Sequence, residues 1–204
     1  TIGRRQRQMC IRDSGGLTGL PLGLAASDIY LHDTYYVIGH FHYVVAPGTI
    51  FALFAGIYYW FPKMTGKKMS EMLGKMHFWP SLIFMNGIFM PMFIQGLAGV
   101  SRRLADGGQS YAHASGVLEW NEFMSISAFC LGLAQIPFIV NIFMSLFSGA
   151  KASRNPWDST TIEWAAPSPP VGHGNFDGPI NVYHTAYEYS VPDDKKDFKP
   201  QFEN

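Results

Sequence analysis

The apolar residues of this chain gather into three long blocks that contain no Asp, Glu, Lys or Arg. The blocks occupy residues 35–62, 77–100 and 123–150. About 20 residues of α-helix cross a hydrocarbon core, so each block is long enough to do so. None of the blocks alternates strictly between apolar and polar residues, as a half-buried strand does. We therefore expect an all-α integral membrane fold with three transmembrane helices and an irregular C-terminal tail.

Prolines mark where these helices are expected to bend or end. Pro47, followed by Gly48, predicts a kink in the first helix, and Pro62 predicts its end, because proline donates no backbone hydrogen bond. Pro91 predicts a bend in the second helix and Pro137 a kink in the third. Four amide side chains within the blocks are expected to bond to neighbouring helices: Asn86, Gln95, Gln135 and Asn141.

The connecting segments predict an orientation. The loop at residues 63–76 carries four lysines and one glutamate, and short positive loops face the cytoplasm. The connector at 15–34 and the loop at 101–122 are then expected on the periplasmic side, and residues 151–204 form a cytoplasmic tail.

Residues 1–14 differ from the rest, with four arginines and one aspartate. We interpret them as a foreign junction sequence; the alternative is a basic arm that touches anionic lipid headgroups. The whole chain has a formal net charge of zero, so no basic field predicts a nucleic-acid partner. Cys10 and Cys130 have neither the number nor the spacing of a disulfide framework or a metal site.

Two histidines, His40 and His42, stand near one end of the first block. Each residue of an α-helix turns about 100°, so positions i and i+2 lie roughly 200° apart and the two rings point to opposite sides. One helix could then serve two separate centres. In a strand both side chains would share a face and could chelate one ion. A third interpretation is a pair of buried histidines bonded to neighbouring helices, although ionisable groups inside membranes are functional candidates by default.

Three motifs surround these histidines in a fixed order: Gly15-Gly-Leu-Thr-Gly19, Leu31-His-Asp-Thr-Tyr-Tyr36 and Gly39-His-Phe-His-Tyr-Val44. Together they closely resemble the catalytic subunit, subunit I, of haem–copper cytochrome oxidases. The resemblance implies that His40 is the proximal ligand of the high-spin haem and that His42 is an axial ligand of the low-spin haem. Phe41 would lie between the two haems, which are expected to be a-type.

The same resemblance gives roles to polar residues near the histidines. His32 and Asp33 match a pair that binds a Mg or Mn ion. On residue chemistry alone, Asp33 could also be a helix N-cap, as could Thr34. Asp28 matches a carboxylate near a propionate of the high-spin haem, and its alternative is a solvated loop acid.

An arginine pair follows the second block. Arg102 and Arg103 match a pair that binds haem propionates through bidentate, charge-assisted bonds. The alternative is a solvated pair in a loop. We expect Asp106 to orient the two arginines.

The resemblance also implies a reaction and partners. The chain would supply the last three of about twelve helices of subunit I, and the copper ligands would lie in the remaining helices. The parent would reduce O₂ to water with electrons from cytochrome c, coupled to proton translocation, in a lipid bilayer with subunits II and III. We expect this piece to be inactive alone. The alternatives are a quinol-oxidising relative and a noncatalytic membrane structural or transport module.

Overall fold

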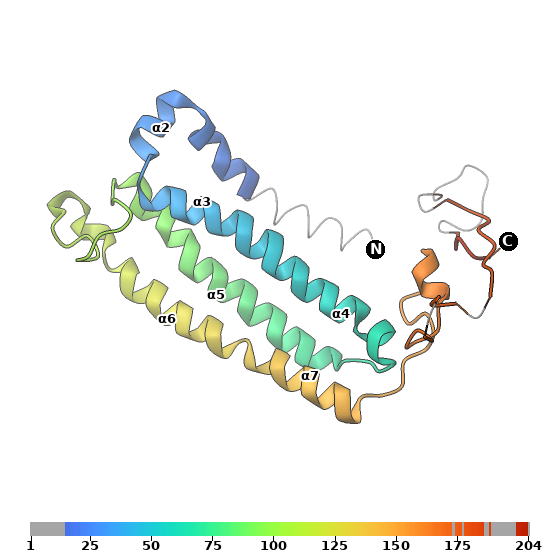
Figure 1. The fold of residues 1–204 in the computed structure, drawn as a ribbon. Coiled ribbons are helices and arrows are strands. Elements are labelled where there is room, and N and C mark those ends of the chain that lie inside the picture. Colours follow the sequence, from blue (N-terminus) through green and yellow to red (C-terminus); the bar gives the residue numbers. More distant parts are fainter. Residues whose placement is uncertain (1–14, 173, 177, 186–187, 189–198, 204) are drawn as a thin grey trace. The chain divides into compact units, whose positions relative to one another are not determined.

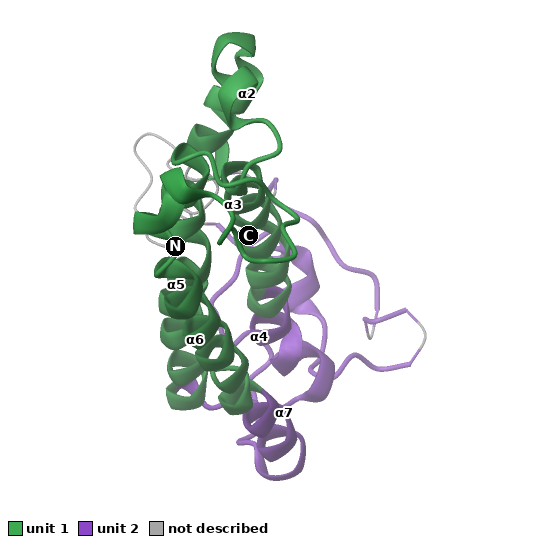
Figure 2. Cartoon of the chain, turned by 90° about the vertical axis from the view of Figure 1, so that its left-hand side faces the viewer, with its two compact units in different colours: residues 1–55, 72–138 green, residues 56–71, 139–204 purple. Residues whose placement is uncertain are grey.

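The computed structural model describes residues 15–172, 174–176, 178–185, 188 and 199–203 (Figure 1). The arginine-rich segment 1–14 lies outside the described residues. The chain divides into two compact units, which Figure 2 colours separately. Unit 1 comprises residues 1–55 and 72–138, and unit 2 comprises residues 56–71 and 139–204.

Three helical segments are long and apolar enough to cross a membrane, as predicted. They run over Tyr35–Thr65, Glu71–Leu97 and Trp120–Ser148. The described residues form helices, turns and two isolated bridges, and contain no sheet. The predicted all-α membrane fold is therefore confirmed.

The first span changes its winding in the middle. It comprises α3 (Tyr35–Val45), a π-helical segment (Ala46–Phe51) and α4 (Ala52–Thr65). The predicted kink at Pro47 thus takes the form of a wide turn. Proline has no amide hydrogen to donate to the carbonyl four residues earlier. In a π-helix the bonds run from i to i+5, so that carbonyl can accept from the amide of the next residue instead.

The ends of the first span are set by local hydrogen bonds. Thr34 is the N-cap, and its side chain accepts a bond from the amide of Tyr36 at 3.3 Å. At the other end the helix continues through Pro62 to Thr65, beyond the predicted end. The amide of Gly66 donates to the carbonyl of Pro62 at 2.9 Å, so the backbone hydrogen bonding continues past the proline.

The second span is α5 (Glu71–Leu97), an unbroken α-helix that contains Pro80 and Pro91. It begins six residues before the predicted block, because the sequence from Glu71 to Met76 consists mainly of good helix formers. It ends at Leu97, and Gly99 then takes a φ of +81°, a conformation that suits glycine.

The third span is divided into α6 (Trp120–Leu133) and α7 (Ile136–Ser148). The interruption lies just before Pro137, as the predicted kink requires. The proline ring clashes with the carbonyl four residues earlier, which belongs to Leu133, the last residue of α6.

Within unit 1, α3 and α6 pack against α5, and the ribbon shows the three running alongside one another (Figure 1). The hydroxyl of Tyr43 donates to Oδ1 of Asn86 at 2.6 Å. Near the end of α5, a Cβ placed on Gly96 would lie 2.6 Å from Cα of Tyr36. Only glycine lets the backbones of α3 and α5 approach this closely.

The amides predicted to bond between helices do so. Nε2 of Gln95 donates to Oδ1 of Asn121 at 2.9 Å, and Gln135 contacts the ring of His77 through a 3.0 Å bond. In unit 2, Asn141 is fully buried and bonds both the amide and the carbonyl of Ser70, each at 2.9 Å. These bonds satisfy polar groups that would otherwise be unpaired in an apolar environment, although Oε1 of Gln95 is buried without a hydrogen-bond partner.

Unit 2 is built around a lysine and a tryptophan. Nζ of Lys63 donates to the carbonyls of Ala166 at 2.6 Å and Arg154 at 3.1 Å. The same ammonium lies 5.0 Å from the ring centre of Trp164, which belongs to a short 3₁₀-helix, Ile162–Ala165. The two hydrogen bonds and the cation–π contact of Lys63 thus attach the tail to the end of α4.

Three shorter helical segments lie in the described part of unit 1. Residues 15–23 are helical, α2 covers Ala25–Leu31, and a 3₁₀-helix covers Ala112–Val117. The first of these carries the Gly-Gly-Leu-Thr-Gly motif and places it against His40 of α3.

Candidate functional site

His42 lies on α3 against the second span. Its ring stacks on Phe89 of α5, with centroids 4.3 Å apart and planes 12° from parallel. Its Nδ1 lies 2.8 Å from the carbonyl oxygen of Ile38. A carbonyl only accepts, so the ring proton is on Nδ1 and Nε2 keeps its lone pair.

His40 contacts a different segment. Its Nδ1 lies 3.1 Å from the hydroxyl oxygen of Thr18. A Cβ placed on Gly19 would lie 2.8 Å from Cε1 of the same ring. The imidazole therefore lies directly against the helix of residues 15–23.

The two imidazoles thus contact different segments, as expected for positions i and i+2 of a helix. The strand interpretation is wrong, because both histidines lie in the α-helix Tyr35–Val45. Phe41, between them in sequence, is 56% exposed and its ring meets that of His42 edge-on at 5.4 Å. Each histidine bonds through Nδ1, and neither bond uses Nε2.

A cluster of charged residues lies at the start of α3. Asp33 forms an ion pair with Nη2 of Arg102 through Oδ1, and its Oδ2 lies 3.5 Å from Nε2 of His32. Nδ1 of His32 lies 3.9 Å from a carboxylate oxygen of Asp28. The structure therefore brings together four of the residues that the sequence singled out.

Backbone pairing creates this cluster. The amide of Tyr35 donates to the carbonyl of Val100 at 3.0 Å, and the amide of Arg102 donates to the carbonyl of Asp33 at 2.8 Å. Asp33 and Arg103 both adopt left-handed backbone conformations, with φ of 58° and 65°. Such conformations are uncommon outside glycine and gather at functional sites.

Asp106 does not contact the arginines, contrary to our expectation. Its carboxylate accepts bonds from the amides of Gly108 at 3.0 Å and Ser110 at 2.8 Å, and from the Ser110 hydroxyl. These bonds, led by the hydroxyl, lower the pKa of the Asp106 carboxyl below its ordinary value. The partner of Arg102 is Asp33, because the backbone pairing places them side by side.

Among the described residues, no three or more His, Cys, Asp or Glu side chains lie close enough together to hold a metal ion. His32 and Asp33 therefore offer at most two protein ligands, and a Mg or Mn ion there would need water or other ligands to reach its usual coordination number.

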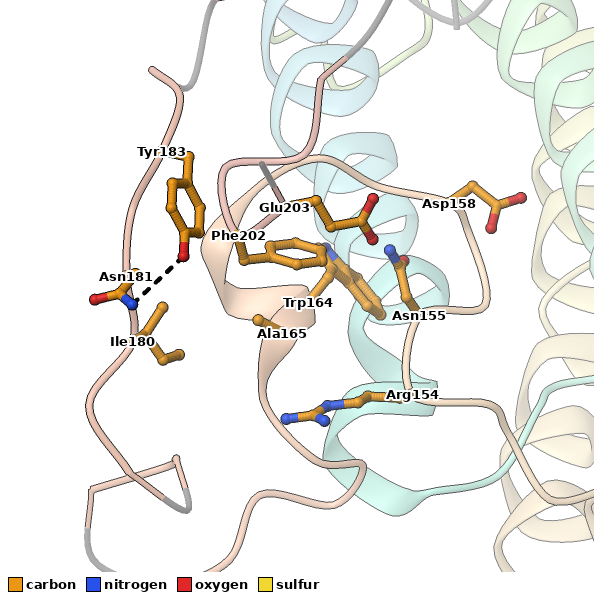
Figure 3. A pocket seen from close by; sticks show the side chains of 10 residues that line it. All are labelled: Arg154, Asn155, Asp158, Trp164, Ala165, Ile180, Asn181, Tyr183, Phe202 and Glu203. Carbon is orange, nitrogen blue, oxygen red and sulfur yellow. Dashed lines mark hydrogen bonds between the residues drawn. The ribbon is translucent and has the colours of Figure 1, made fainter.

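The tail contains a separate open pocket of about 530 Å³ (Figure 3). Arg154, Asp158 and Glu203 supply charges to its wall, and Trp164 supplies an aromatic surface. None of the site residues predicted from the sequence lines it.

Several contacts of the histidines were not predicted. Thr18 belongs to a motif that the sequence analysis used only for its resemblance, and Phe89 was not singled out at all. The motif gave a signal for Thr18, because a hydroxyl in a glycine-rich segment can approach a neighbouring helix closely. Nothing in the local sequence distinguishes Phe89 from the other aromatic residues of α5.

Comparison with known proteins places these residues in a family. The family model for cytochrome c and quinol oxidase polypeptide I matches residues 10–154. This chain belongs to that oxidase family. Its three apolar helices are accordingly integral membrane segments, and the haem–copper chemistry of the family implies haem and copper as cofactors.

Curated relatives cover most of this chain. Cytochrome c oxidase subunit 1 of Synechocystis is 44% identical over 177 residues, 87% of this chain and 31% of that protein. Alternative cytochrome c oxidase subunit 1 of Bradyrhizobium diazoefficiens is 42% identical over 189 residues, 92% of this chain and 32% of that protein. The oxidase-family chain thus spans about a third of the length of these relatives.

The histidine geometry fits the haem that the family implies. A neutral imidazole with a free Nε2 lone pair is a common axial ligand of haem iron, and a hydrogen bond at the other nitrogen fixes its tautomer and orientation. His42 meets this description through its bond to the carbonyl of Ile38, and Nδ1 of His40 also lies within hydrogen-bond distance of a partner, the Thr18 hydroxyl.

Proposed function

We propose that this chain is part of the catalytic subunit of a terminal respiratory oxidase that reduces O₂ to water with electrons from cytochrome c and translocates protons. The observation that carries the proposal is the pair His40 and His42. They lie on one membrane-spanning helix, contact different segments and bond through Nδ1, so that neither bond uses Nε2. Two separate haem irons require such an arrangement.

In this proposal His40 binds the iron of the high-spin haem and His42 that of the low-spin haem, both a-type. Phe41 lies between them. When bound, the haems supply electron transfer and O₂ chemistry. The protein holds each imidazole in a fixed tautomer, and the stack on Phe89 restricts rotation of His42.

Arg102, Arg103 and Asp28 are proposed to face the haem propionates. Arginine suits this role because its planar fork forms two parallel bonds to a carboxylate. Arg102 is already paired with Asp33, so this carboxylate would hold the guanidinium in place. His32 and Asp33 are proposed to bind Mg or Mn, with further ligands from water or from other parts of the parent.

Cytochrome c is the proposed electron donor, because both relatives described above are named cytochrome c oxidases. The family model also covers quinol oxidases, so a quinol donor is the second candidate. Oxidation of reduced cytochrome c and of a quinol by the purified complex distinguishes them, since only one should turn over rapidly.

The proposed partners are the remaining helices of subunit I, which carry the copper ligands, and subunits II and III. The four lysines of the 63–76 loop favour a cytoplasmic position for that loop. The histidine end of α3 then faces the periplasm and the tail faces the cytoplasm of a bacterial inner membrane. This chain alone is proposed to be inactive.

The test uses the full parent subunit in its complex. We expect His42→Ala to remove the low-spin haem spectrum, because iron loses an axial ligand. His40→Ala should remove the high-spin haem and its binding of carbon monoxide. Haem content per complex, measured by the pyridine haemochrome spectrum, should fall from two to about one in each variant, as expected for loss of an axial ligand.

His113→Ala provides the control, since His113 is an exposed histidine outside the spans and should leave both haems in place. A wild-type complex without stoichiometric haem would contradict the proposal and favour the noncatalytic membrane module. Unchanged spectra in His42→Ala would do the same.

A further inference from the structure

We propose that Thr18 is a positioning residue that fixes the tautomer and the direction of the His40 ring. The inference rests on the proposed haem function, because it concerns what His40 offers to iron. Thr18 lies outside the three spans, in the helix of residues 15–23. It reaches His40 through a side-chain hydroxyl rather than through the backbone.

The direction of the hydrogen bonds follows from simple counting. The Thr18 hydroxyl lies 2.9 Å from the carbonyl oxygen of Gly15 and 3.1 Å from Nδ1 of His40. A carbonyl can only accept, so the single hydroxyl proton is donated to Gly15. The hydroxyl oxygen then accepts, and Nδ1 of His40 must donate. The proton is held at Nδ1 and the lone pair is left at Nε2.

The neighbouring glycine makes room for this bond. A Cβ on Gly19 would lie 2.8 Å from Cε1 and 3.4 Å from Nε2 of His40. Real Cβ atoms do not approach this closely, so any side chain at position 19 would push the ring away. Thr18 and Gly19 therefore act together: one holds the ring by its nitrogen, and the other lets the ring lie against the helix.

A comparison with His42 shows why it matters that the partner of His40 is a side chain. Its Nδ1 donates to the carbonyl of Ile38, one turn earlier on the same helix. No side-chain substitution removes that acceptor. The equivalent acceptor for His40 is a threonine from another segment, so a single substitution can remove it. The orientation of His40 is therefore open to tuning, whereas that of His42 is fixed by α3 itself.

Loss of the bond should weaken the ligand. An acceptor at Nδ1–H increases the basicity of Nε2 and fixes the ring orientation, and removing such a partner commonly reduces metal affinity or activity 10–100-fold. Thr18 bonds onward to Gly15, so the two bonds polarise each other. The effect should appear directly in the bond between iron and His40.

The experiment uses resonance Raman spectra of the reduced complex carrying Thr18→Ser, Thr18→Cys or Thr18→Val. The iron–histidine stretching frequency of the high-spin haem should be unchanged in Thr18→Ser, which keeps the hydroxyl. It should be lower in Thr18→Cys, because sulfur is a weak acceptor, and lowest in Thr18→Val, which has the shape of threonine without the acceptor. The low-spin haem spectrum should be unchanged throughout and reports that the complex is intact.

Equal frequencies in the wild type, Thr18→Ser and Thr18→Cys would overturn the inference, even if Thr18→Val failed to assemble. His40→Ala separates this failure from that of the proposed function. If His40→Ala retains the iron–histidine band, the haem assignment itself is wrong. If it loses the band while the Thr18 series is flat, His40 is the ligand and Thr18 does not position it.

Discussion

The side chains of Lys63 and Asn141 in unit 2 use their polar groups more completely than the imidazoles of His40 and His42 in unit 1. In unit 2, Lys63 donates to two carbonyls and Asn141 bonds both polar groups of Ser70. In unit 1, His40 and His42 each bond through one nitrogen and leave the other with its lone pair. A buried polar group whose bonds are complete indicates a structural role, whereas one with a directed lone pair indicates a ligand.

This comparison predicts the largest loss of stability in unit 2. Lys63→Met would leave the buried carbonyl of Ala166 without its donor, at a cost of about 1–3 kcal/mol, whereas the carbonyl of Arg154 would keep its bond from the Ser168 hydroxyl. The measurement is the thermal unfolding midpoint of the parent complex, together with proteolysis of the tail.

Lys67→Met is the matched control. Nζ of Lys67 also donates to two carbonyls, those of Leu146 and Phe147, but these bonds are exposed. Water can replace the donor there, so the loss should be much smaller. Equal losses in the two variants would contradict the view that burial makes the Lys63 bonds important.

A smaller effect is expected at Asp106, which is exposed and has all its bonds within one loop. Because these bonds favour the carboxylate, its pKa is lowered in the folded protein. Their contribution to stability is present above the ordinary pKa of aspartate and is lost as the pH falls through the lowered value. The carboxyl signal in infrared difference spectra against Asp106→Asn should titrate below the ordinary range.

Ser110→Ala sharpens this test, since the Ser110 hydroxyl is the largest cause of the shift. The pKa of Asp106 should move back towards its ordinary value in that variant. A wild-type titration at the ordinary value would show that the loop bonds do not favour the charged form.

The smallest effect on stability is expected at His32, whose side chain is 67% exposed. His32→Ala should leave the unfolding midpoint unchanged, yet abolish the electron paramagnetic resonance signal of Mn²⁺ incorporated into the complex during growth. His113→Ala, another exposed histidine, should retain the signal. A retained signal in His32→Ala would remove this residue from the proposed metal site.

The sequence predicted the spans well because long uncharged blocks have few alternatives in a membrane protein. It predicted their ends less well. Pro62 was taken as a terminus, but its carbonyl accepts from the amide of Gly66 and the helix continues to Thr65. Glu71 is charged and so lay outside the apolar block, although it is a good helix former.

In the candidate site, too, some features could be predicted from the sequence and others could not. The positions of His40 and His42 on opposite sides follow from helix geometry. The pairing of Asp33 with Arg102 does not, because it depends on backbone bonds between distant parts of the chain. Asp106 lies closer to Arg102 in sequence than Asp33 does. Its carboxylate, however, accepts hydrogen bonds from amides of its own loop.

The wide turn at Ala46–Phe51 has a consequence for anyone who draws this span as a helical wheel. A π-turn holds more residues per revolution than an α-turn, so the angular phase of the side chains slips across it. Counting forward from His42 at 100° per residue assigns faces correctly only as far as Val45. From Ala52 onward the wheel has to be restarted, and a design that mutates one stripe along the whole span would alter two different faces.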